Sequence, residues 1–189
     1  MTTTISFLAL AVLLPVLFII DHQHQYINCQ HVHEIHNAIV LIRGGPKSGG
    51  LVRGELRFRE NKNGRVNIRG QIEGLAKGQH GMHVHQWGDI SLGCEKAGSH
   101  FDAHHAAHGA RGSHAHTGDF GNIVAADNGV ARVNINDSFV ELHGDNSIVG
   151  RAILVHEHRD DLGQGGNNKS LITGNAGSPV GCGVVAWDD

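Results

Sequence analysis

Short apolar runs separated by turn residues dominate the chain from residue 38 onward. Residues 38–43 form a run rich in β-branched side chains, and residues 52–59 alternate between apolar or glycine positions and charged ones. Residues 66–72 repeat this alternation after a hairpin signal at residues 61–64. A period of two residues is typical of a strand with one buried and one solvated face. These segments are therefore predicted to be strands.

Five later runs continue the pattern, at residues 123–126, 130–135, 139–142, 148–156 and 183–187. No stretch shows a long apolar period of 3.6 residues, so the sequence predicts an all-β fold. About eight short strands with frequent turns favour an eight-stranded antiparallel Greek-key β-sandwich or barrel. Residues 88–118 and 157–179 lack strand character. They are expected to be two long functional loops, because loops of that length in a compact domain usually carry function.

The N-terminal segment follows a different pattern. Residues 5–20 form an uncharged, largely apolar run that contains Pro15. The run is slightly shorter than the ~20 residues of a membrane span and is typical of a signal-peptide core. No Lys or Arg precedes it and no small-x-small cleavage site follows, so an uncleaved anchor and a buried helix remain alternatives. We expect residues 1–20 to be a signal peptide, residues 21–36 a His-rich polar connector and residues 37–189 the folded domain.

Export is supported by two N-glycosylation triplets, Asn136-Asp137-Ser138 and Asn168-Lys169-Ser170. The protein is therefore predicted to be a secreted, extracellular glycoprotein. The net charge is only -3 and no dense Lys/Arg block occurs, so no nucleic-acid partner is expected. No membrane partner is expected unless the N-terminal segment stays uncleaved.

Histidine is unusually abundant, with 17 copies against 15 Lys and Arg together. Neutral imidazole is a common ligand of zinc and copper. Two interpretations are open for the connector at residues 21–36, a solvated linker, which we favour, or a tail that captures copper. Cys29 in this connector could pair between subunits, and spacing alone does not choose a disulfide among Cys29, Cys94 and Cys182.

Two segments of the folded domain concentrate possible metal ligands. In a strand, His83 and His85 project from the same face, at about 6.6 Å between their Cα atoms, so both imidazoles can converge on one ion. Farther along, one glycine-rich loop carries His100, His108, His116 and Asp119. Three imidazoles and a carboxylate are a suitable tetrahedral set for zinc.

Spacing alone does not select the ligands of this loop. His104, His105 and His114 lie in the same segment and are equally available by sequence. Incidental clustering in a histidine-rich chain is the alternative to a metal site.

Several ordered motifs resemble those of the Cu/Zn superoxide dismutases. The first is His80-Gly81-Met82-His83-Val84-His85 followed by Gly88-Asp89. The others are Val155-His156-Glu157, Asp160-Asp161-Leu162-Gly163, Thr173-Gly174-Asn175-Ala176-Gly177 and Gly181-Cys182-Gly183-Val184. The similarity extends from about residue 38 to residue 187, which is nearly the whole folded domain.

This resemblance implies a site of two metals. The positions that match the family's copper ligands, which are also its catalytic residues, are His83, His85, His100 and His156. The positions that match its zinc ligands are His100, His108, His116 and Asp119, so that His100 would bridge both ions. Asp160 matches the carboxylate that links a copper-site histidine to a zinc-site histidine, here His83 and His108. The family's disulfide maps to Cys94 and Cys182.

One position departs from the family pattern. Family members usually carry an arginine beside copper that attracts and orients the anion, and Pro179 occupies the matching position here. In the neighbouring loop, Asn168 and Lys169 stand where the family commonly has two acidic residues. We therefore expect a superoxide dismutase with copper and zinc as cofactors, superoxide as substrate and the family's usual homodimer, but with slowed turnover. The alternative is a secreted copper/zinc-binding or carrier protein on the same scaffold.

Overall fold

The computed structural model describes residues 37–45 and 48–188. The expected signal peptide, the His-rich connector and Cys29 lie outside these residues. Among the residues that the structure describes, no helix has the length and apolar character needed to cross a membrane.

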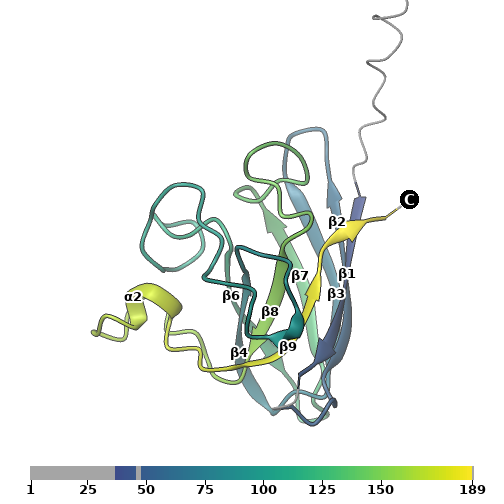
Figure 1. Cartoon of the computed structure of the whole chain (residues 1–189), viewed down its shortest axis with the longest axis vertical. Helices are drawn as coiled ribbons and strands as arrows, with labels where there is room; N and C mark the ends of the chain where they lie inside the picture. Colours follow the sequence, from purple (N-terminus) through teal and green to yellow (C-terminus); the bar gives the residue numbers. More distant parts are fainter. Residues whose placement is uncertain (1–36, 46–47, 189) are drawn as a thin grey trace, which may run out of the picture. The chain divides into compact units, whose positions relative to one another are not determined.

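Ten strands and one short helix are found in the described part of the chain (Figure 1). The elements are β1 (Asn37–Gly44), β2 (Arg53–Glu60), β3 (Val66–Glu73), β4 (Gly78–Val84), β5 (Ser91–Cys94), β6 (Asp119–Ala125), β7 (Ala131–Asp137), β8 (Ala152–His156), α2 (Ser170–Thr173), β9 (Pro179–Val184) and β10 (Ala186–Trp187). The sheet order is β1-β2-β3-β7-β6-β4-β8-β9, and β9 pairs back with β1. Eight antiparallel strands thus close into a barrel, as the sequence predicted.

The strand order also confirms the Greek-key connection. β3 is followed along the chain by β4, but β7 and β6 lie between them in the sheet. Likewise β7 leads to β8 across β6 and β4. Two connections therefore cross the ends of the barrel, which is the mark of a Greek key.

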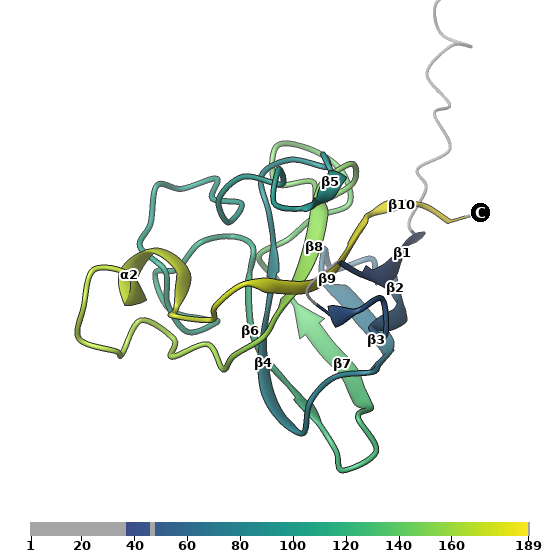
Figure 2. The ribbon, with the colours of Figure 1, turned by 60° about the horizontal axis from the view of Figure 1, so that its bottom comes forward.

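Alternation along the strands fills the barrel interior. In β2, Leu56 and Phe58 are buried, at 0% and 1% exposure. Arg57 and Arg59, which alternate with them, face solvent. β4 and β8 instead have consecutive buried residues. Both long loops lie on the side of these two strands and away from β1–β3 (Figures 1 and 2). The loops therefore cover the outer face that β4 and β8 would otherwise expose.

The predicted strand at residues 139–142 is wrong. The Asp137 carboxylate accepts hydrogen bonds from the backbone N–H groups of Phe139 and Val140, at 2.7 and 2.8 Å, and this turn ends β7. Val140 and Leu142 are nevertheless fully buried. The apolar pattern here marked core residues supplied by a loop, which a period of two cannot distinguish from a strand.

Three other expected elements differ in extent. The expected strand at residues 148–156 is present only as β8, because a turn precedes Ala152. The first long loop contains the short strand β5, and the second contains the helix α2. Both loops remain largely irregular.

A disulfide joins Cys94 at the end of β5 to Cys182 in β9. The two residues are 88 positions apart. The bond therefore closes a long segment that contains most of the first long loop and the strands β6, β7 and β8. Cross-linking such a segment removes many conformations from the unfolded chain. The bond also fixes the start of the first long loop against the barrel.

We predict that the double variant Cys94→Ser/Cys182→Ser has a free energy of unfolding lower by ~2–4 kcal/mol. Equilibrium urea unfolding of the metal-free protein, followed by far-ultraviolet circular dichroism, measures this change. Cys29→Ser is the matched control, because it removes a thiol and leaves this pair intact. An unfolding midpoint equal to that of the unmodified chain would contradict the expectation.

Candidate metal centre

Four buried histidines from three parts of the chain converge beside the barrel. His83 lies in β4, His85 directly follows it, and His156 ends β8. His100 comes from the first long loop, which an isolated antiparallel bridge between His85 and His100 holds against the strand end. One potential ligand atom from each of the four lies within 4.8 Å of all the others. The predicted pairing of His83 and His85 on one face thus occurs, and it continues into a cluster of four.

A second cluster adjoins the first around the carboxylate of Asp119, the first residue of β6. Nδ1 of His100 lies 2.8 Å from Oδ1 of Asp119, and Nδ1 of His108 lies 3.0 Å from Oδ2. Nδ1 of His116 lies 3.2 Å from the same carboxylate oxygen Oδ2. The group whose ligand atoms all lie within 4.8 Å of one another contains His83, His100, His108 and Asp119, and His116 is not a member of it. All four residues expected at the zinc position therefore meet here, and His100 belongs to both clusters.

The remaining histidines of the first long loop point elsewhere. His104, His105 and His114 are exposed and belong to neither cluster. The path of the loop determines which of its histidines reach the clusters, which residue spacing alone did not predict.

Each clustered imidazole is held by one ring nitrogen and presents the other to its neighbours. Nδ1 of His85 donates to the carbonyl oxygen of Gly98 at 2.8 Å, and Nδ1 of His156 donates to that of Gly177 at 3.0 Å. A neutral imidazole that donates from one nitrogen keeps a lone pair on the other. These outward bonds therefore fix both the ring orientation and the tautomer.

Asp160 holds two further rings at once. Its Oδ2 accepts a hydrogen bond from Nε2 of His83 at 2.9 Å, and its Oδ1 accepts one from Nε2 of His108 at 2.7 Å. His83 belongs to the first cluster and His108 to the second, and Asp160 is fully buried. One carboxylate thus fixes the position of a ring in each cluster relative to the other.

The inward nitrogens have no hydrogen-bond partner among the described residues. They are Nδ1 of His83, Nε2 of His85, Nε2 of His100 and Nε2 of His156, whereas Nδ1 of His108 faces the Asp119 carboxylate at 3.0 Å. A buried polar atom without a partner is costly. A soft or borderline cation bound by these lone pairs would remove that cost, and nitrogen-rich donor sets suit copper and zinc. The residues present therefore fit both metals.

Burial keeps the imidazoles of the first cluster neutral. Burial, followed by repulsion from the neighbouring His100, lowers the pKa of His85 to about 3. Burial also lowers the pKa of His156 to about 4, and the pKa of His83 lies well below 6.5 for the same reason. Neutral rings are the form that binds a metal ion, so this cluster needs no proton loss at neutral pH.

His108 behaves differently because it lies between two carboxylates. Burial lowers its pKa, but hydrogen bonds to Asp119 and Asp160 outweigh burial and raise the pKa to about 9. The same hydrogen bonds hold the pKa of both carboxyl groups below the ordinary value despite their burial. Without a metal, His108 is therefore protonated at neutral pH, and a cation at this cluster takes the place of that proton.

Several supporting residues were not recognised from sequence as having a role. The Asn122 side chain donates to the backbone oxygen of Asp160 and accepts from its N–H, both at 2.8 Å. Gly174 has a φ of 60°, and a Cβ there would collide with the Asp160 carboxylate and the His108 ring. Both ring nitrogens of His80 lie within 2.9 Å of carbonyl oxygens, so His80 supports the site without being a ligand. His80 and Gly174 lie in two of the motifs quoted above, and membership of those motifs was the only sequence signal of their roles.

Comparison with known proteins gives a consistent result. The family model described as "Copper/zinc superoxide dismutase (SODC)" matches residues 52–185. The chain is 45% identical over 155 residues to "Superoxide dismutase [Cu-Zn]" of Onchocerca volvulus, covering 79% of this chain and 95% of the relative. It is 48% identical over 141 residues to "Extracellular superoxide dismutase [Cu-Zn]" of Brugia pahangi, covering 72% of this chain and 70% of the relative.

A solved structure shares the fold. The structure titled "Crystal Structure Analysis of the clock protein EA4" aligns with a TM-score of 0.76 and 38% sequence identity, over 81% of this chain and 95% of that one. The family match, the closed eight-stranded barrel and two clusters of nitrogen-rich ligands agree. The chain therefore belongs to the copper/zinc superoxide dismutase family, an oxidoreductase family whose cofactors are copper and zinc.

Proposed function

We propose that this chain is a secreted superoxide dismutase with slowed turnover. In this proposal the copper ligands and catalytic residues are His83, His85, His100 and His156, and the zinc ligands are His100, His108, His116 and Asp119. The observation that carries the proposal is the set of inward-facing, unpaired ring nitrogens described above. The relatives named as superoxide dismutases support the reaction.

The reaction converts two superoxide anions and two protons into dioxygen and hydrogen peroxide. Bound copper supplies reversible exchange of one electron, and bound zinc supplies charge and structure without redox chemistry. The chain's own residues hold the geometry. His100 faces the first cluster with Nε2 and Asp119 with Nδ1, so a single rigid ring connects the two sites.

Asp160 positions the rings on both sides of this connection. In Asp160→Asn, one side-chain atom becomes a donor and faces a ring nitrogen that already donates. Either His83 or His108 must then change tautomer, and its proton moves to the nitrogen that would bind the metal.

We predict that Asp160→Asn lowers zinc affinity by ~10–100-fold. Competition with a chromophoric chelator, starting from metal-free protein, measures the affinity. Asp127→Asn is the control, because this exposed carboxylate pairs only with Lys77 in the described part of the chain. Unchanged zinc affinity in Asp160→Asn would show that the carboxylate does not position the rings.

Turnover is proposed to be slowed by Pro179. This residue pairs with His156 at a register shift between β8 and β9, so position 179 lies beside a proposed copper ligand. Proline carries no charge and no donor, whereas an arginine there would present five N–H donors and a full positive charge. Charge focusing of this kind raises association rates by ~10–10³-fold.

We predict superoxide turnover lower by about one to two orders of magnitude than in family members with the arginine, with weak dependence on ionic strength. Stopped-flow decay of superoxide at several salt concentrations tests this with the metal-loaded protein. Pro179→Arg should raise the rate and make it fall more steeply with salt, whereas Pro179→Gln should change neither. A diffusion-limited, salt-sensitive rate in the unmodified chain would overturn the proposal.

The alternative function is copper and zinc binding or carriage on the same scaffold. Pro179 is the observation that favours it, because a carrier has no need to attract superoxide. A protein that holds both metals tightly but decomposes superoxide no faster than a variant lacking His156 would support the alternative.

The proposed organisation is a signal peptide at residues 1–20, a connector at residues 21–36 and a catalytic domain at residues 37–189. The name of the Brugia pahangi relative supports export. Asn136 and Asn168 are exposed and available as glycan acceptors. Intact-mass spectrometry of protein from the culture medium tests both points, since an uncleaved N-terminus or bare asparagines would each contradict one of them.

A homodimer is proposed from the exposed aromatic and aliphatic side chains near the disulfide. Trp87 and Leu92 are 55% and 67% exposed; Trp87 precedes β5 in the chain and Leu92 lies within it. Burying them between two copies would be favourable. Analytical ultracentrifugation should find twice the mass of one mature chain, and a monomer at micromolar concentration would contradict this.

A further inference from the structure

The middle of the first long loop contains an arginine whose side chain is largely buried. The guanidinium group of Arg111 lies 4.6 Å from the centre of the Phe120 ring and 5.4 Å from that of the Phe139 ring. The side chain of Arg111 is only 19% exposed. Removing a charge from water is costly unless other groups replace the lost hydration. The contacts of this guanidinium group therefore indicate what Arg111 does.

The guanidinium group of Arg111 connects two strands of the barrel. Its Nη2 forms an ion pair with the buried carboxylate of Asp137, the last residue of β7. Its Nη1 donates to the backbone oxygen of Asp119, the first residue of β6, at 2.5 Å. A planar group with five N–H donors in a fixed fork can make both contacts at once.

Asp137 is a fixed partner for this arginine. Its Oδ1 accepts the two backbone hydrogen bonds that end β7, and its Oδ2 faces Arg111. The position of the carboxylate is therefore set by the barrel and not by the first long loop. Through this ion pair, Arg111 attaches the middle of the loop to the end of the barrel.

The chain on both sides of Arg111 wraps around the Asp119 carboxylate. Oδ2 of Asp119 accepts hydrogen bonds from the backbone N–H groups of Gly109 at 3.3 Å and His116 at 3.2 Å. The rings of His108 and His116 face the same carboxylate. Arg111 lies between these two histidines in the sequence. Its attachment to the barrel therefore holds the segment that carries both rings against Asp119.

The first cluster is held by other contacts. The rings of His83, His85 and His156 are fixed by hydrogen bonds to Asp160 and to the carbonyl oxygens of Gly98 and Gly177. All of these partners lie outside residues 109–116. Loss of the Arg111 contacts should therefore affect the second cluster and leave the first cluster largely unchanged.

The charge of Arg111 and its attachment to the barrel have opposite effects on a bound cation. The Asp119 carboxylate attracts the guanidinium group, so the two charges are close enough to interact. A positive charge at this position repels a zinc ion that binds the same carboxylate. A variant that lost only the charge would therefore bind zinc more tightly. A variant that lost the attachment of the loop would bind zinc more weakly.

We propose that Arg111 is a positioning residue for zinc. By attaching residues 108–116 to Asp137, it holds the imidazoles of that segment against the Asp119 carboxylate and strengthens zinc binding. The inference rests on the proposed function, because it takes the second cluster as the zinc site. Residue spacing does not indicate this role, since Arg111 and Asp137 become neighbours only through the path of the loop.

The test measures the zinc affinity of full-length, metal-loaded protein by competition with a chromophoric chelator. In Arg111→Gln, zinc affinity should fall by ~10–100-fold, because a group that orients metal ligands is lost. Arg111→Lys keeps the charge but cannot make both contacts at once, so its zinc affinity should also fall. Copper affinity should change by less than about threefold in both variants, since the partners of the first cluster are unchanged. An equal loss of copper affinity would show a general loosening of the fold and would overturn the proposal.

A double-mutant cycle connects the effect to the ion pair. Asp137→Asn keeps an oxygen for the turn that ends β7 and removes the charge that holds Arg111. Zinc affinity should therefore fall as it does in Arg111→Gln. The double variant should be no weaker than the weaker single variant, because both changes break one interaction. Fully additive losses would show that the two residues act separately, which contradicts the proposal.

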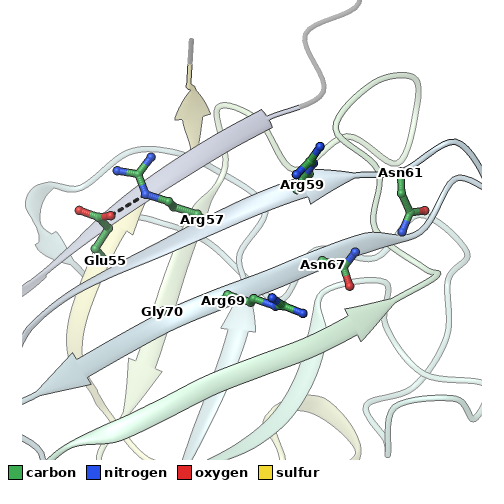
Figure 3. Close-up of a pocket in the computed structure, with 7 residues that line it drawn as sticks. All are labelled: Glu55, Arg57, Arg59, Asn61, Asn67, Arg69 and Gly70. Atoms are coloured by element: carbon green, nitrogen blue, oxygen red, sulfur yellow. Dashed lines mark hydrogen bonds and ion pairs between the residues drawn. The ribbon is translucent and has the colours of Figure 1, made fainter.

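Arg59→Gln is the matched control, because it removes an exposed arginine on the outer face of β2, where it lines an open depression (Figure 3). Its zinc affinity should equal that of the unmodified chain. Unchanged or tighter zinc binding in Arg111→Gln would overturn the positioning role, and Arg111→Lys and Asp137→Asn decide the matter if Arg111→Gln does not fold. An unmodified chain that binds no zinc would instead contradict the proposed function.

Discussion

Four buried imidazole nitrogens, from His83, His85, His100 and His156, face one another without hydrogen-bond partners in the described part of the chain, and the rest of the structure is organised around that arrangement. Leaving such atoms unpaired in a dry interior is unfavourable, so the fold must hold the rings in place by other means. It does so through carbonyl oxygens on Gly98 and Gly177 and through the shared carboxylate of Asp160. A closed barrel supplies the rigid strands β4 and β8 on which this arrangement rests.

The two clusters of the metal centre differ in charge. The first cluster is kept neutral by burial, whereas the second holds two carboxylates that keep the pKa of His108 at about 9. The two clusters therefore differ before any metal binds, since one offers only lone pairs and the other offers negative charge as well. This difference suits a redox-active metal beside a structural one.

The strands and the pairing of His83 with His85 on one face could be predicted from local patterns. Alternation in residues 52–59 and 66–72 correctly indicated β2 and β3, and a period of two placed His83 and His85 on one face. The same period failed at residues 139–142, where a loop supplies buried residues and Asp137 ends the strand. Burial alone does not reveal backbone pairing.

The proposed ligands in the first long loop, and the residues that support them, could not be derived from spacing. His100, His108 and His116 reach the centre by loop paths that depend on distant contacts, and His104 in the same loop points to solvent. Resemblance identified these residues and Asp160, but it gave no role to Asn122 or Gly174. Nor could the sequence reveal that Arg57 and Arg69 lie opposite each other, because they become neighbours only through strand register.

The central claim is that adjoining copper and zinc sites share the ring of His100. Anomalous diffraction from crystals of the metal-loaded protein, collected on either side of the copper and zinc absorption edges, tests it most directly. The account predicts one copper peak at Nε2 of His100 and one zinc peak at its Nδ1. A single peak, or two peaks with His100 bound to neither metal, would contradict it.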